Sequence, residues 1–199
     1  MLINLFLKKP ILYKEIEKYQ YGALFGIASY SLYTINFVSD FTFINNLMFL
    51  FLTGETFFLP YNRIDSIIHH LLGIGFICYP KFYSIPLNTI IPHSTTFLRV
   101  ETSSIFLCSS YFLKEKLKSS KNKILPYLSN ASNVLLITSF LKYRIYDFMG
   151  KILLNSDFYN DMLVENTNSH LYLYTTTFSF FLLNSYWFSK MCKIALKMF

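Results

Sequence analysis

The sequence predicts an all-α fold, a polytopic membrane bundle of about six transmembrane helices packed around a polar interior. Only 15% of the 199 residues are charged and 53% are hydrophobic, whereas a soluble domain carries about 25% charged residues. Several apolar runs approach the roughly 20 residues that a spanning helix needs, and their few polar residues suit helices packed around a polar interior. These runs cover residues 21–39, 41–59, 62–79, 94–113, 125–147 and 171–189.

Turn and proline signals bound the first three runs. Asp40 predicts a tight turn between the first two runs, and Pro60 with Asn62 ends the second. Pro80 is expected to end the third run, because proline removes a backbone donor from a helix.

A proline-rich segment separates the third run from the fourth. Pro86 and Pro92 are expected to prevent residues 81–92, KFYSIPLNTIIP, from forming one continuous helix. Pro126 lies in the first turn of the fifth run, a position that proline tolerates.

The distribution of charge tests this division independently. Six spans with a cytoplasmic N-terminus place lysines on the cytoplasmic side at Lys8, Lys9, Lys14, Lys18, Lys114, Lys116, Lys118, Lys121, Lys123, Lys190, Lys193 and Lys197. The opposite side receives Asp157, Asp161 and Glu165 with Lys81 alone. Lysine-rich loops are typical of the cytoplasmic side of a membrane, so both termini are predicted to be cytoplasmic.

The length predicts a single domain. Residues 1–14 form an N-terminal cytoplasmic or interfacial segment, residues 15–195 form the transmembrane domain, and residues 196–199 form a short cytoplasmic tail. The mixture of apolar and charged positions near the N-terminus is typical of a segment that lies along a membrane surface.

Composition argues against several classes of function. Lys and Arg exceed Asp and Glu by seven, 18 against 11, but the lysines flank apolar runs, so nucleic acid is not expected as a partner. The three cysteines have no disulfide or metal-binding spacing. Four histidines with one adjacent pair are too few for the histidine boxes of membrane di-iron enzymes, and we expect no metal and no cofactor.

The segment RIDSIIHHLLGIGF contains the first candidate site, formed by Asp65, His69 and His70. Asp65 and His69 are four residues apart and therefore share a helix face. There Asp65 could orient His69 or raise its affinity for a proton, which would give the histidines a catalytic role. Alternatively, Asp65 stabilises the helix N-terminus while the histidines reach for the membrane interface.

The second candidate site contains the lipid-binding candidates Glu101, Ser104, Asn133 and Arg144. A carboxylate inside a membrane is expensive and usually faces a partner or a wet cavity. Arg144 and Asp147 are three apart and could form a pair, or both could simply be solvated near the outer surface. With a rise of about 1.5 Å per residue and a core of roughly 30 Å, His69 and Glu101 lie about 10 Å apart in depth, so they could line one cavity without touching.

Three segments resemble the TLC-domain family of membrane proteins, shared by translocating-chain-associating proteins and ceramide synthases. They are RIDSIIHHLLG, FLRVETSSIFL and SFLKYRIYDF, within a resemblance that covers about residues 15 to 195. The resemblance implies a helical bundle around a lipid-accessible cavity. In the ceramide synthase branch, a histidine pair matching His69 and His70 supports N-acylation of a sphingoid base by acyl-CoA.

The segment LLGIGFICY after the histidines departs from the synthase pattern. It lacks the expected threonine and the later serine–tyrosine pair, and the acid-rich motif that follows is also missing. The chain is more similar to the small TLC-domain proteins. We therefore expect a protein that binds membrane lipids and influences membrane lipid composition, without deciding whether it is an enzyme.

Two alternatives stay open. One is a ceramide synthase-like N-acyltransferase that uses the histidine pair, with acyl-CoA as a substrate only. The other is a transporter, because acids inside a membrane are able to line an ion path. The expected location is a multi-pass position in a membrane like the endoplasmic reticulum, or in a host membrane if the source is viral. Membrane lipids are the expected partners, and no protein partner is predicted.

Overall fold

The computed structural model describes residues 10–38, 41–58, 64–120, 122–164 and 167–196, and no β-strand occurs in these ranges. The all-α prediction is therefore confirmed for this part of the chain. The helices are α2 (Pro10–Phe37), α3 (Thr42–Phe58), α4 (Ile64–Phe82), α5 (Leu87–Val100), α6 (Thr102–Ser119), α7 (Leu125–Ser139), the π-helices η1 (Phe140–Asp147) and η2 (Met149–Leu153), α8 (Ser156–Met162) and α9 (Thr167–Ala195).

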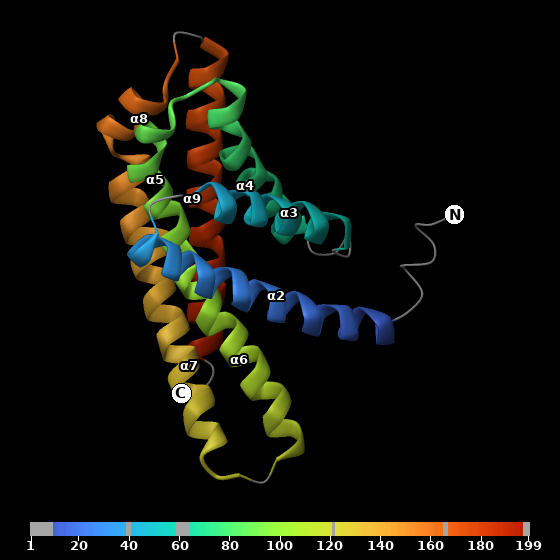
Figure 1. Ribbon diagram of the computed structural model, residues 1–199. Coiled ribbons are helices and arrows are strands. Elements are labelled where there is room, and N and C mark those ends of the chain that lie inside the picture. Colours follow the sequence, from blue (N-terminus) through green and yellow to red (C-terminus); the bar gives the residue numbers. More distant parts are fainter. Residues whose placement is uncertain (1–9, 39–40, 59–63, 121, 165–166, 197–199) are drawn as a thin grey trace.

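Helix α9 runs along the long axis of the molecule and packs on α4, α7, η1 and η2 (Figure 1). Helices α6 and α7 form a hairpin at one end, whereas α8 lies at the opposite end. Helices α2 and α3 run across the long axis, and they pack on α6 and α4 respectively. The positions of the predicted runs are thus recovered as helices, with changes at several ends.

The prediction that Pro80 ends its helix is wrong, whereas the prediction that residues 81–92 do not form one continuous helix is confirmed, because residues 83–86 are not helical. Pro80 lies inside α4, which continues to Phe82, and Pro92 lies inside α5. Helix α4 instead ends at Phe82 and is capped by Ser84, whose φ of 55° is left-handed, with the Ile85 N–H donating to the Pro80 carbonyl at 2.9 Å. This arrangement is a Schellman-type cap, and it satisfies carbonyl groups in the last turn of α4. Pro80 removes only one donor in the last turns.

The positions predicted for Pro86, before a helix, and for Pro126, in a first helical turn, are confirmed. Pro86 has an extended backbone and immediately precedes α5, which therefore begins at Leu87 rather than at residue 94. Pro126 lies in the first turn of α7, where its missing N–H would have no partner inside the helix.

Glu101 divides the predicted fourth run into α5 and α6. Its N–H bonds the Leu98 carbonyl at 3.1 Å, and its own carbonyl accepts from the Ser104 N–H at 2.9 Å. Both bonds span three residues, so the backbone tightens for one turn before the helix resumes. This junction lies beside the candidate site described below.

The fifth run becomes a long rod of α7, η1 and η2 that extends to Leu153. A π-helix is bonded from residue i to i+5 and is frequent at functional sites. Its wider turns change which side chains share a face, and this register determines where Arg144 points.

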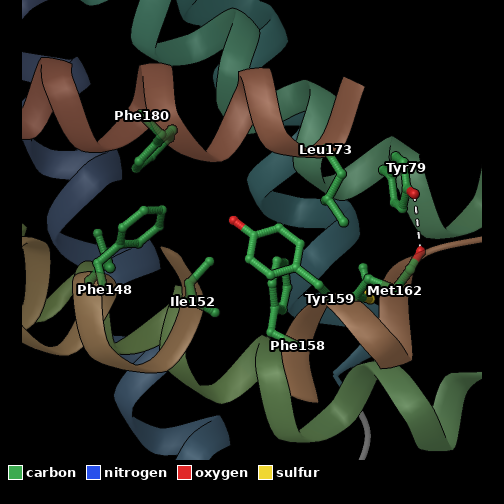
Figure 2. Close-up of a cluster of buried hydrophobic side chains, with 9 residues drawn as sticks. Tyr79, Phe148, Ile152, Phe158, Tyr159, Met162, Leu173 and Phe180 are labelled. Carbon is green, nitrogen blue, oxygen red and sulfur yellow. Dashed lines mark hydrogen bonds between the residues drawn. The ribbon is translucent and has the colours of Figure 1, made fainter. Parts of the chain in front are cut away.

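A largely aromatic cluster fills the end of the bundle near α8 (Figure 2). Phe148 and Phe158 are completely buried, and the rings of Phe148 and Phe180 stack with their centroids 5.4 Å apart. The Tyr79 hydroxyl donates to the Met162 carbonyl at 3.0 Å and thereby ties α4 to α8. A second cluster, Ile27, Phe41, Ile44, Met48 and Leu98, joins α2 and α3 to α5.

In the ranges that the structure describes, none of the helices combines the length and the apolar character needed to cross a bilayer. The six membrane spans therefore remain a prediction. Helix α2 begins at Pro10, within the segment predicted as N-terminal, and α9 ends at Ala195. Several predicted features lie outside the described residues, namely Lys8, Lys9, Asp40, Pro60, Asn62, Lys121, Glu165, Lys197 and most of the segments 1–14 and 196–199.

Candidate functional site

A cavity of about 350 Å³ lies between the helices, with walls from α2, α3, α4, α6, α7, η1 and α9. We call it the central cavity. Apolar side chains such as Leu24, Phe51, Leu107 and Leu136 form part of its wall. Its polar lining consists of Glu17, Gln20, Tyr21, Glu55, Asp65, Ser66, His69, His70, Glu101, Ser103, Ser104, Arg144, Trp187 and Lys190.

Glu101 and Arg144 form a buried ion pair on one wall of this cavity. Arg144 Nη2 lies 3.5 Å from Glu101 Oε2, and the two side chains are 6% and 10% exposed. Arg144 also donates to Ser103 Oγ at 2.7 Å and to Ser104 Oγ at 3.0 Å, and Ser104 in turn donates to Glu101 Oε2 at 2.7 Å. Hydrogen bonds of this kind are what make a buried charge pair tolerable.

Arg144 and Asp147, for which both a pair and solvation were open, do not pair with each other. Asp147 Oδ1 instead lies 3.4 Å from Lys151 Nζ. Both residues of the predicted pair belong to η1, and the wider π-helical turn removes the alignment of positions three apart on which the prediction depended. Arg144 consequently points across the bundle towards α6.

The adjacent histidines have different surroundings. His70 Nε2 lies 3.1 Å from Glu55 Oε2, which joins α4 to α3. The ring of His69 packs between Phe180 and Trp187, with centroid distances of 4.9 and 4.8 Å. His69 Nδ1 is buried and has no hydrogen-bond partner in the described part of the chain. A buried polar atom without a partner calls for an explanation, and a bound molecule is one.

Asp65 lies where the start of α4 meets the end of α9. Its Oδ1 accepts from the Ser66 N–H, and its Oδ2 accepts from Trp187 Nε1 at 3.0 Å. Lys190 Nζ is 3.6 Å from the same Oδ2 and lies over the Tyr186 ring. The hydrogen bond that Lys190 donates to Tyr186 and the nearby Asp65 carboxylate raise the pKa of Lys190 above its ordinary value, so the ammonium is charged at neutral pH.

Carboxylates outnumber cations along the central cavity. Its lining contains four acids against the two cations Arg144 and Lys190, which gives a formal charge of −2 if both histidines are neutral. Such a lining can hold a polar or charged group, while the apolar wall covers an attached hydrocarbon part. The lining therefore combines the polar and apolar surfaces that an amphiphile needs.

A second, smaller cavity of about 110 Å³ adjoins the central cavity. Four residues line both cavities, namely Met48, Leu52, His69 and Glu101. The smaller cavity reaches His93, whose Nε2 lies 2.8 Å from Asp161 Oδ2 on α8. In the described ranges, no group of three or more His, Cys, Asp or Glu side chains is placed to hold a metal ion.

The structure brings most of the sequence-predicted site residues together. Asp65, His69 and His70 line the same cavity as Glu101, Ser104 and Arg144. Asn133 is half-buried on α7 and is not part of the lining.

Sequence reasoning missed Trp187 and Lys190 as site residues. Trp187 is the only tryptophan of the chain, but nothing in the sequence connects it with Asp65, 122 positions away. Glu55 was identifiable as an acid within an apolar run, although not as the partner of His70.

Comparison with known proteins gives one match. A family model described as the TLC domain matches residues 3–193. No curated protein and no solved structure matches the chain. The matched region contains every residue that lines the central cavity except Ile194.

Proposed function

The chain belongs to the TLC-domain family, and we propose that its central cavity binds a membrane lipid. Membership indicates a lipid-related role and supports a membrane location. The further proposal is that this protein holds the polar head of a lipid among the charged side chains and thereby influences membrane lipid composition.

The observation that carries the proposal is the combination of a charged lining with an apolar wall in one cavity. Ligand sites are usually concave and largely apolar, with a few placed polar groups that fix the orientation of the ligand. Here Arg144 and Lys190 suit an anionic oxygen, whereas the acids suit an amine or a hydroxyl group. His69 Nδ1 adds a buried hydrogen-bonding atom that still lacks a partner.

The outer surface supports placement in a membrane. Helix α9 exposes large apolar side chains at intervals of three or four residues, so that they form one continuous stripe: Leu171, Tyr174, Phe178, Leu182 and Tyr186. An extended apolar surface of this kind marks contact with a membrane or a partner. We propose a multi-pass arrangement with both termini cytoplasmic, in an endoplasmic-reticulum-like membrane or in a host membrane if the source is viral.

Charge separation along the long axis supports this orientation. The tip between α6 and α7 carries Lys116, Lys118 and Lys123, whereas α8 carries Asp157 and Asp161. The tip and α8 lie at opposite ends of the molecule (Figure 1). Lysine-rich ends face the cytoplasm in membrane proteins.

Lipid analysis of the purified protein tests the binding proposal. Protein extracted in mild detergent is expected to retain a defined lipid class, and His69→Ala is expected to retain at least tenfold less. His170→Ala is the matched control, because His170 is exposed and outside the central cavity. Retention without lipid preference that is equal in the wild type and in His69→Ala would overturn the proposal.

A second candidate function is acyl transfer from acyl-CoA to an amine-bearing lipid, and the Glu55–His70 contact favours it. A carboxylate beside a histidine orients the ring and raises its basicity, the arrangement that a general base requires. His70 would remove a proton from the amine as it attacks the thioester carbonyl, and the coenzyme A thiolate would leave.

Membranes supplied with acyl-CoA and a sphingoid base test this second candidate. The His69→Ala/His70→Ala double variant is expected to lose N-acylation that the wild type supports, and Glu55→Gln to lower it. His170→Ala is expected to retain the full rate. Equal ceramide output from the wild type and the double variant would exclude the transferase function.

A further inference from the structure

The two adjoining cavities differ in chemical character. The charged groups, which include Asp65 and Lys190, line the central cavity. The smaller cavity continues beyond His69 and Glu101 into a region walled by apolar side chains such as Ile77, Ile90 and Phe97. A molecule that occupies both would place its polar end in the first and its apolar end in the second.

Gly73 lies on the wall of the smaller cavity, one helical turn after His69 on the same face of α4. A Cβ atom at this position would lie 2.9 Å from Leu52 Cδ1 on α3. Leu52 is one of the residues that line both cavities. The wall of the smaller cavity is therefore formed at this point by a residue without a side chain, next to a residue that both cavities share.

We propose that the smaller cavity receives the end of the hydrocarbon tail of the lipid, and that residue 73 sets the length of tail that is accepted. This inference rests on the proposed lipid binding in the central cavity. It assigns to Gly73 a role in specificity, because any side chain there would project towards Leu52 and into the space that a tail occupies.

The cavity volume sets the size of the expected effect. An apolar cavity of about 150 Å³ takes up benzene, with six carbon atoms. By the same measure, the smaller cavity of about 110 Å³ has room for roughly four methylene-sized groups. Filling this cavity should shorten the preferred tail by about two to four carbons.

Two variants that change the cavity in opposite directions test the inference. Gly73→Leu fills part of the smaller cavity, whereas Ile90→Ala removes side-chain volume from the wall of this cavity. Each protein is purified in mild detergent from cells that contain lipids of mixed tail length, and the retained lipids are resolved by mass spectrometry. Gly73→Leu is expected to retain shorter tails than the wild type, and Ile90→Ala longer ones.

Gly54→Leu is the matched control, because a Cβ atom at Gly54 meets nothing within 4 Å and Gly54 lines neither cavity. Its tail profile should equal that of the wild type. Retained lipid with the same tail profile in all variants would overturn the role of residue 73 and leave lipid binding intact. A wild-type protein without lipid would overturn both proposals. If Gly73→Leu does not fold, the Ile90→Ala profile decides the outcome.

Discussion

At the scale of single residues, the ion pair of Glu101 and Arg144 dominates the interior. Moving two charges out of water is costly, and the pair is retained only because hydrogen bonds satisfy both partners. Ser103 and Ser104 provide these bonds from the first turn of α6. The tight turn at Glu101 places the carboxylate beside Ser104, so backbone geometry and charge pairing support each other.

Removing the arginine should destabilise the protein strongly. Arg144→Met leaves the Glu101 carboxylate buried without its cation, and breaking such a pair costs about 3–5 kcal/mol. We expect a clear fall in the midpoint of thermal unfolding in detergent. Arg99→Met is the control, because Arg99 is exposed and its loss should change the midpoint little.

The double variant separates charge from packing in this experiment. Glu101→Gln/Arg144→Met removes both charges, and we expect it to be more stable than Arg144→Met alone. A double variant as unstable as the single one would mean that the packing of the Arg144 side chain, and not its charge, carries the effect.

At the scale of helices, α4 and α9 approach each other closely at Gly75. A Cβ atom there would lie 2.3 Å from the Tyr172 hydroxyl oxygen on α9. The Tyr172 ring is stacked on Tyr79, with an interplanar angle of 5°, and the Tyr79 hydroxyl bonds Met162 of α8. The absence of a side chain at Gly75 therefore allows a connected set of contacts across three helices.

Alanine at two glycine positions should have different effects. Gly54→Ala adds a methyl group in open space and should stabilise α3 by up to about 1 kcal/mol, because alanine favours the helix. Gly75→Ala should be less stable than Gly54→Ala, since it displaces Tyr172. In a Tyr172→Phe background the difference should shrink. Equal denaturation midpoints for the two single variants would contradict this account.

At the scale of the whole molecule, the arrangement of charge predicts an orientation. The lysine-rich tip between α6 and α7 and the acidic helix α8 lie at opposite ends. Lys118→Cys and Asp157→Cys, each in a background without the three native cysteines, should react with a membrane-impermeant thiol reagent from opposite sides. Labelling of both positions from the same side of sealed vesicles would contradict the proposed topology.

The sequence was sufficient to predict the helical fold and the positions of most helices, because apolar runs and turn signals are local features. It also identified several residues that line the central cavity, since ionisable groups in apolar runs usually face a partner or a cavity. They are Asp65, His69, His70, Glu101, Ser104 and Arg144. The sequence did not identify Glu101 as the partner of Arg144. The π-helical register of η1 changes the direction of that side chain, and no local pattern in the sequence predicts such a register.

The contacts of Asp65 with α9 were not predictable for another reason. Trp187 and Lys190 meet Asp65 only through the packing of α9 on α4. Proline signals were partly misleading, because Pro80 and Pro92 lie inside helices whose remaining hydrogen bonds suffice. Local sequence therefore indicated which residues carry the chemistry, and tertiary packing decided which of them meet.

Photo-crosslinking with a lipid that carries a photoactivatable group near its polar head tests the central claim most directly. The account predicts labelled peptides from the cavity-lining segments of α4 and α9, around His69 and Trp187, with labelling reduced by excess unmodified lipid. Labelling confined to the outward stripe of α9, at Phe178 and Leu182, and unaffected by competing lipid would show that lipid contacts only the outer surface. That result would contradict lipid binding in the central cavity.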